Sequence, residues 1–134
     1  MEGILFLCIA NSCRSQMAEG LARNIMGPDV LIRSAGSEPT RVAPEAIKVM
    51  AEVGIDISKQ QAKSVQDIDL SELDLAITLC ADEVCPLLPP GIKHLHWPIR
   101  DPAMDREEKD VRDAFREARD TLQQRIEELR TTAP

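Results

Sequence analysis

Four short apolar segments alternate along this chain with helix-like segments, and this alternation is the feature that most restricts its fold. The apolar segments cover residues 3–9, 30–36, 74–79 and 92–97. Apolar residues recur at helical spacing from Met17 to Met26, again after Pro44, and from about residue 105 to 130. Strands that alternate with helices predict a parallel sheet covered by helices. We therefore expect an α/β fold of three layers, with a four-stranded parallel sheet flanked by helices and a short helix near residues 67–73.

Length and charge restrict the class of protein further. A chain of 134 residues that is 43% hydrophobic can form one sizeable core, so we expect a single domain over residues 1–134. The formal net charge of -7 and the lack of a basic block argue against a nucleic-acid partner. No leader-like segment precedes Gly3, and no apolar segment approaches the length of a membrane span. The sequence predicts a cytoplasmic protein that does not contact a membrane.

The turn after the first predicted strand carries the strongest chemical signal. Residues 8–15 read CIANSCRS and lead directly into the first predicted helix. Backbone N–H groups in such a turn point inward together, and the helix N-terminus adds positive potential. Arg14 can grip two oxygens of a tetrahedral anion, and in this field we expect the Cys8 thiol to lose its proton easily. The predicted oxyanion site consists of Cys8, Ile9, Ala10, Asn11, Ser12, Cys13, Arg14 and Ser15.

Within this site Cys8 is the candidate nucleophile, beneath the central atom of the bound oxyanion. The spacing of Cys8 and Arg14 is weak evidence alone, and an inert strand cysteine is the alternative. Ser15 can donate a hydrogen bond to the Cys8 sulfur, or it can serve the helix N-terminus. Asp101 follows the last predicted strand, at the sheet edge where ligands of open parallel sheets bind. It is the candidate acid for the leaving oxygen, unless the Asp101–Pro102 pair only initiates the last helix.

The four cysteines favour redox chemistry over structural disulfides. Cysteines beside strand–helix–strand units in a reducing compartment are usually catalytic or metal-bound. A four-cysteine zinc site is disfavoured because the spacings differ from CxxC pairs and Arg14 would lie beside the metal. If the central atom of the oxyanion is reducible, a second thiol can attack the sulfur adduct and leave a disulfide. We predict that Cys80 attacks at Cys8 and that Cys85 then attacks at Cys80, which presents the disulfide to an external dithiol.

Several segments together resemble the thioredoxin-coupled arsenate reductases, which share the low-molecular-weight protein tyrosine phosphatase fold. The resemblance covers nearly the whole chain. It implies that Cys8 is the nucleophile, that Arg14 and Ser15 bind and activate, that Asp101 is the acid, and that Cys80 and Cys85 are the resolving pair. It also implies arsenate as substrate, a role in arsenic detoxification, no tightly bound cofactor and an external thiol reductant, and we expect a monomer. The matching segments are residues 8–20, 34–36, 52–58, 78–80, 85–86, 96–97 and 101–103.

Two departures from the family bear on partners and ions. Four residues separate Cys80 from Cys85, two fewer than is usual in the family, so a glutaredoxin system is an alternative to thioredoxin. Similar enzymes bind a monovalent cation through residues matching Asn11, Glu19 and Ser34 plus an aspartate, whose place Lys63 takes here. We expect no metal, because the Lys63 ammonium can replace the ion; the alternative is an exposed lysine with no role.

Two other functions remain as alternatives. A low-molecular-weight tyrosine phosphatase would need only the oxyanion loop and the acid, and such enzymes usually carry an aromatic residue where Ala103 follows Pro102 here. A phosphatase also has no use for Cys80 and Cys85. A non-catalytic oxyanion or arsenite sensor would not need the acid, the activating serine or the resolving pair.

Overall fold

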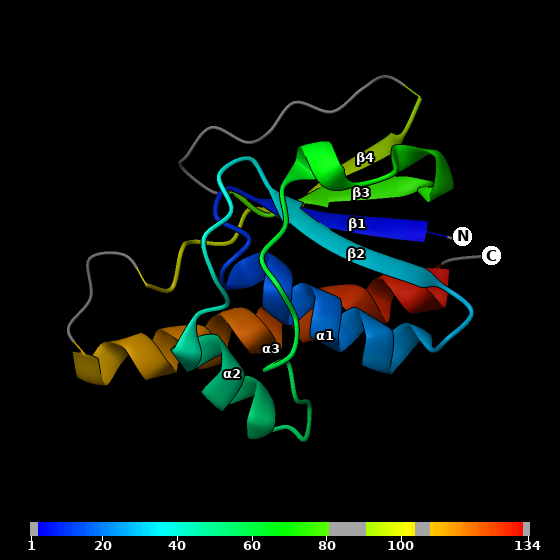
Figure 1. Ribbon diagram of the computed structural model, residues 1–134. Helices are drawn as coiled ribbons and strands as arrows, with labels where there is room; N and C mark the ends of the chain where they lie inside the picture. The colour runs from blue at the N-terminus through cyan, green and yellow to red at the C-terminus, as the bar shows by residue number, and fades with distance from the viewer. Residues whose placement is uncertain (1–2, 81–90, 104–107, 133–134) are drawn as a thin grey trace.

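A computed structural model of the chain describes residues 3–80, 91–103 and 108–132. It contains four strands in the order β2-β1-β3-β4, and every neighbouring pair is parallel (Figure 1). This confirms the predicted four-stranded parallel sheet. The elements along the chain are β1 (Gly3–Cys8), α1 (Arg14–Met26), β2 (Leu31–Gly36), α2 (Pro44–Ala51), β3 (Leu75–Thr78), β4 (Lys93–His96) and α3 (Glu108–Thr132), with short 3-10 turns η1 (Val65–Asp67) and η2 (Leu70–Glu72).

The first strand lies at the centre of the sheet and is buried along its whole length. Its alternate side chains serve two apolar clusters. Ile4 and Phe6 belong to the larger cluster, which includes side chains of α1, α2 and α3. Leu5 and Leu7 belong to a smaller cluster with Leu73 and side chains of η1 and η2. An uninterrupted apolar run is what a strand buried on both faces requires.

The two faces of the sheet are covered unequally. All three α-helices lie on one face, and the segment with η1 and η2 crosses the other (Figure 1). The predicted short helix near residues 67–73 is present as two 3-10 turns. Each turn is preceded by a residue whose side chain accepts a hydrogen bond from a backbone N–H of the turn, Ser64 before η1 and Asp69 before η2. Such a cap stabilises a single short turn, whereas an α-helix needs a longer segment.

Helix α1 is the most enclosed helix, with every residue from Arg14 to Ala22 buried. One reason is Gly20, because a Cβ there would lie 2.6 Å from Ile57 Cγ2. Helix α3 is amphipathic and is tied to the end of α2 by Glu52, which pairs with Arg116 and Arg119. Within the described residues, no helix combines the length and apolarity needed to cross a membrane.

Candidate active site

The loop between β1 and α1 holds its carbonyl groups away from its interior. Each backbone oxygen from Ile9 to Cys13 accepts a hydrogen bond of 2.9–3.0 Å. The donors are the backbone N–H groups of Glu38, Thr40, Ala43 and Met17 and the side-chain amide of Gln16. Because these oxygens are engaged on the outside, the loop's own N–H groups are the polar groups left to line its interior. The predicted oxyanion site requires inward-facing N–H groups of this kind.

Two residues allow the backbone to take this path. Asn11 is fully buried with a φ of 47°, a left-handed conformation that asparagine tolerates better than most residues. Gly36, at the end of β2, lies against the loop so closely that a Cβ would be 2.3 Å from the Ile9 carbonyl oxygen and 2.8 Å from the Asn11 nitrogen. Only glycine fits at this point of contact.

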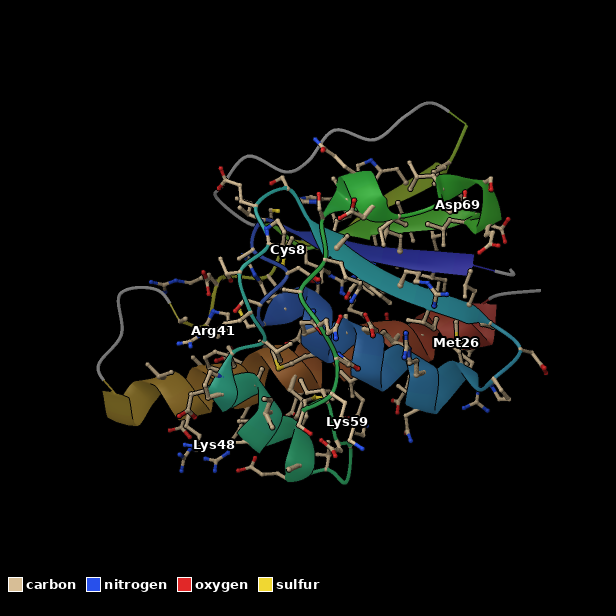
Figure 2. The ribbon with its side chains drawn as sticks, viewed as in Figure 1. Cys8, Met26, Arg41, Lys48, Lys59 and Asp69 are labelled. Atoms are coloured by element: carbon tan, nitrogen blue, oxygen red, sulfur yellow. The ribbon has the colours of Figure 1, made fainter. Side chains whose placement is uncertain are left out.

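The Cys8 thiol lies at the carboxyl end of β1, beside the start of α1 (Figure 2). Its Sγ is 2.9 Å from Ser15 Oγ, and Ser15 Oγ accepts a hydrogen bond of 2.7 Å from Asn11 Nδ2. No side chain caps the N-terminus of α1, so its first N–H groups remain available to an anion. Cys8 and Ser15 are buried, so the 2.9 Å contact between them is shielded from solvent.

Arg14 links the loop to the ends of the neighbouring strands. Its Nη1 donates to the carbonyl oxygens of Ile99, at 2.8 Å, and Leu79, at 3.4 Å. The side chain is only 4% exposed. Two backbone acceptors therefore hold the guanidinium in place beside residues 8–15. Because the side chain is already ordered, it would lose little conformational entropy on binding a substrate.

Asp101 reaches the loop through Cys13. Cys13 Sγ donates to Asp101 Oδ1 at 3.7 Å, and the same oxygen accepts a hydrogen bond of 2.9 Å from Ala103 N. Burial, and next the charge of Asp101, raises the pKa of Cys13 to about 12. Cys13 is therefore a protonated donor at neutral pH, and it helps to place the predicted acid. Sequence reasoning assigned Cys13 only a place in the loop and missed this contact, which spans 88 positions of the chain.

Cys80 is fully buried and follows β3. Strands β1 and β3 are hydrogen-bonded neighbours, with Leu7 paired to Thr78 and Leu79 N donating to Leu7 O. Cys8 and Cys80 therefore emerge at the same edge of the sheet from adjacent strands. Cys85, the predicted second resolving cysteine, lies outside the described residues.

The residues that match the family's cation site, Asn11, Glu19, Ser34 and Lys63, are connected by hydrogen bonds. Glu19 is buried and accepts hydrogen bonds from Ser34 Oγ and from Lys63 Nζ, the latter at 3.4 Å. The Lys63 backbone N–H donates to Asn11 Oδ1 at 2.8 Å. The Lys63 side chain is 29% exposed, so this lysine is not simply solvated. Within residues 3–80, 91–103 and 108–132, no group of three or more His, Cys, Asp and Glu side chains is placed to hold a metal.

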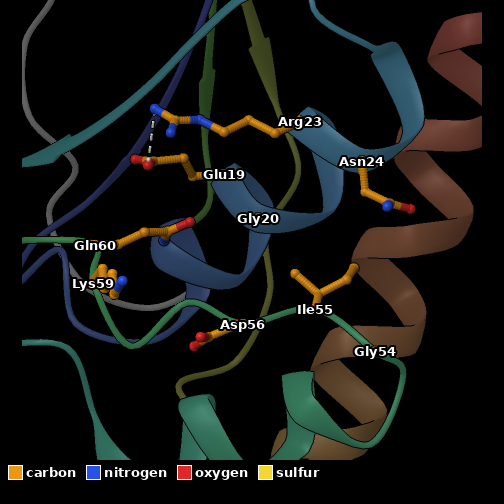
Figure 3. Close-up of a pocket in the computed structure, with 9 residues that line it drawn as sticks. All are labelled: Glu19, Gly20, Arg23, Asn24, Gly54, Ile55, Asp56, Lys59 and Gln60. Carbon is orange, nitrogen blue, oxygen red and sulfur yellow. Dashed lines mark ion pairs between the residues drawn. The ribbon is translucent and has the colours of Figure 1, made fainter.

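A cavity of about 550 Å³ lies between α1 and the segment 54–60, and Glu19, Arg23 and Gln60 are among the side chains that line it (Figure 3). None of its lining residues belongs to the oxyanion loop. Gln60 nevertheless connects it to that loop, because Gln60 Nε2 donates to Gln16 Oε1 at 2.8 Å. Gln16 is the polar residue of this site that sequence reasoning missed. The available signal was its position between Ser15 of the loop and Met17, where the apolar residues at helical spacing begin.

Known proteins resemble this chain over its full length. Residues 3–133 match the family described as low molecular weight phosphotyrosine protein phosphatase. An arsenate reductase of Bacillus subtilis is 42% identical over 132 residues, which cover 96% of this chain and 95% of that protein. A solved arsenate reductase in the phosphate binding state has a TM-score of 0.85 and 35% identity, with both chains covered completely.

A thioredoxin-dependent arsenate reductase of Corynebacterium glutamicum is a more distant structural neighbour. It has a TM-score of 0.73 and 28% identity, and the match covers 99% of this chain and 64% of that one. These matches confirm the fold and the resemblance expected from the motifs. The chain belongs to the low molecular weight phosphotyrosine protein phosphatase family, and arsenate reductases are among its relatives there.

Proposed function

We propose that this protein reduces arsenate to arsenite, through a covalent adduct on Cys8 and a disulfide relay that continues to Cys80 and Cys85. The observation that carries this proposal is the position of Cys80. It is a buried cysteine two residues after β3, and β3 is paired with the strand of Cys8. A hydrolase would need only Cys8, the loop and the acid, whereas a reductase also needs a second thiol within reach.

In the first step the Cys8 thiolate attacks the arsenic of arsenate. An S–As bond forms, an As–O bond breaks, and the leaving oxygen takes a proton from Asp101 and departs as water. Arg14 and the N–H groups of the loop stabilise the negative charge on the remaining oxygens. The Ser15 hydroxyl, 2.9 Å from the sulfur, holds the thiolate before attack.

In the second step the Cys80 thiolate attacks Cys8 Sγ. An S–S bond forms, and the electron pair of the S–As bond goes to arsenic, which leaves as arsenite. The Cys85 thiolate then attacks Cys80, which releases reduced Cys8 and leaves a Cys80–Cys85 disulfide. Two thiols have then lost two electrons and arsenic has gained them, so turnover requires an external dithiol.

We assign thioredoxin as that dithiol, and the thioredoxin-dependent relative of C. glutamicum supports the assignment. The short spacing between Cys80 and Cys85 keeps a glutaredoxin system as the alternative. The proposal includes a cytoplasmic monomer that detoxifies arsenic and holds no tightly bound cofactor, since the relay uses only cysteines and the reductant.

The test is arsenate-dependent NADPH oxidation by the purified protein with thioredoxin and thioredoxin reductase, beside a parallel reaction with glutaredoxin, glutathione and glutathione reductase. We expect turnover in the first mixture and none for Cys8→Ser or Cys80→Ser. Turnover only with glutaredoxin would replace the reductant and keep the reaction. Silence in both mixtures from a folded protein would refute the reductase proposal.

A second activity is favoured by the loop and the placement of Asp101 beside it. Hydrolysis of a phosphate monoester needs the same nucleophile, anion loop and acid, with water completing the turnover. We expect weak hydrolysis of p-nitrophenyl phosphate that survives Cys80→Ser. If aryl phosphate is hydrolysed efficiently while arsenate gives no turnover, the protein is a phosphatase.

A further inference from the structure

Gln16 makes an unusual number of polar contacts for a fully buried residue of α1. Its Nε2 carries two hydrogens and lies within hydrogen-bond distance of three acceptors: the carbonyl oxygen of Asn11 at 3.0 Å, Asn11 Oδ1 at 3.0 Å and the carbonyl oxygen of Gln61 at 2.9 Å. Its Oε1 accepts from Gln60 Nε2 at 2.8 Å. None of these atoms touches the substrate in the mechanism above, so their role must lie in what they hold in place.

Backbone groups determine the orientation of both buried amides. If the Gln16 amide were reversed, its oxygen would face the backbone carbonyl oxygens of Asn11 and Gln61. These two oxygens can only accept hydrogen bonds, so the reversed amide would lose both contacts. The Asn11 amide is oriented in the same way, because its Oδ1 accepts from the backbone N–H of Lys63 at 2.8 Å. Asn11 Nδ2 is then directed at Ser15 Oγ, 2.7 Å away.

The hydrogen bonds consequently run in one direction. Gln60 donates to Gln16, Gln16 donates to Asn11, and Asn11 donates to Ser15. Ser15 Oγ accepts from Asn11 and keeps its own proton to donate, and a Cys8 thiolate, which has no proton, can only accept it across the 2.9 Å contact. Amides aligned in this way polarise one another, which strengthens the last bond of the chain.

We propose that Gln16 is a positioning residue that makes Ser15 a hydrogen-bond donor to the Cys8 thiolate. Gln16 acts through Asn11. Gln60, which lines the cavity of Figure 3, donates a hydrogen bond to Gln16 and so helps to hold its amide. The inference rests on the proposed nucleophilic role of Cys8. It deepens that role by naming what orients the hydroxyl that stabilises the nucleophile.

The test is the rate of Cys8 alkylation by iodoacetamide at about pH 7, in a buffer without oxyanions, with the modified cysteine identified by peptide mass spectrometry. Gln16→Met removes the amide that orients Asn11, so the hydrogen bond from Ser15 to Cys8 should be lost. The loss of one neutral hydrogen bond corresponds to about a three- to tenfold slower reaction, and we expect this change in the alkylation rate for Gln16→Met. The matched control is Gln61→Met. The side chain of Gln61 is exposed and only its backbone carbonyl takes part, so alkylation should keep the wild-type rate.

A double-mutant cycle separates positioning from general loop damage. If Gln16 acts through Ser15, Gln16→Met should change the rate by less than about 1.5-fold when Ser15→Ala is already present. An unchanged rate in the single variant would overturn the proposal. An equal slowing in both backgrounds would overturn it as well, because the effect would not pass through the hydroxyl.

Gln60→Met tests the same chain if Gln16→Met does not fold, since Gln60 is only partly buried. We expect about a twofold slower alkylation of Cys8, and a rate equal to that of Gln61→Met would refute the proposal. Alkylation requires neither arsenate nor a reductant. A protein that fails in the reductase assay but shows these rates would refute the proposed function and leave this inference standing.

Discussion

The contact between Gly36 and the oxyanion loop yields the sharpest prediction, for Gly36→Ala. The new Cβ would lie 2.3 Å from the Ile9 carbonyl oxygen, 2.8 Å from the Asn11 nitrogen and 2.9 Å from the Cys8 carbonyl oxygen. All three are backbone atoms, so no side chain can rotate away. An ordinary contact needs about 3.4 Å, so the loop or β2 must move by roughly 1 Å.

A displacement of about 1 Å at a catalytic site can lower the rate about 100-fold, and overpacking of this kind costs about 1–3 kcal/mol of folding stability. We therefore expect Gly36→Ala to lower kcat/KM for arsenate by roughly 100-fold while the protein remains folded. The assay is arsenate-dependent turnover, with thermal unfolding measured on the same preparation.

Gly3→Ala is the matched control, because its Cβ would lie 2.3 Å from the carbonyl oxygen of Glu72 at the opposite end of β1. It should lose stability but keep specific activity. Wild-type kcat/KM in Gly36→Ala, or an equal loss of activity in both variants, would refute the claim that this contact shapes the loop.

Three further predictions concern the relay, the cation site and the helix pair. Cys85→Ser should complete one round of arsenate reduction and stop with Cys8 bonded to Cys80, which mass spectrometry detects; normal turnover would remove Cys85 from the relay. Potassium should not raise wild-type activity if the Lys63 ammonium replaces the ion, and a clear rise would contradict this. The side-chain hydrogen bond from Arg116, with a further one from Arg119, lowers the pKa of Glu52 from 4.5 to about 2. The contribution of Glu52 to stability is therefore present above pH 4.5 and is lost as the pH falls toward 2. The difference in melting temperature between wild type and Glu52→Gln should therefore shrink over that range, and a constant difference would show that charge is not its cause.

Local sequence determined the strands, the helices and the loop between β1 and α1 of this protein. The first strand, the loop and α1 are contiguous, so the apolar run to Ile9, the eight residues from Cys8 to Ser15 and the helical spacing after them could be interpreted together. The parallel topology followed from the order of the elements, because parallel strands need crossover connections. Boundaries differed by a few residues, as at α1, which begins at Arg14 rather than near Met17.

Contacts between distant segments decided the rest, and no local pattern encodes them. The loop carbonyls are held by residues 38–43, Asp101 is placed by Cys13, and Gln16 meets Gln60 across 44 positions of the chain. Each depends on where the folded sheet and helices bring their loops. The sequence by itself determined which groups could do the chemistry, whereas the tertiary structure decided their orientation, because hydrogen-bond direction depends on partners that become neighbours only on folding.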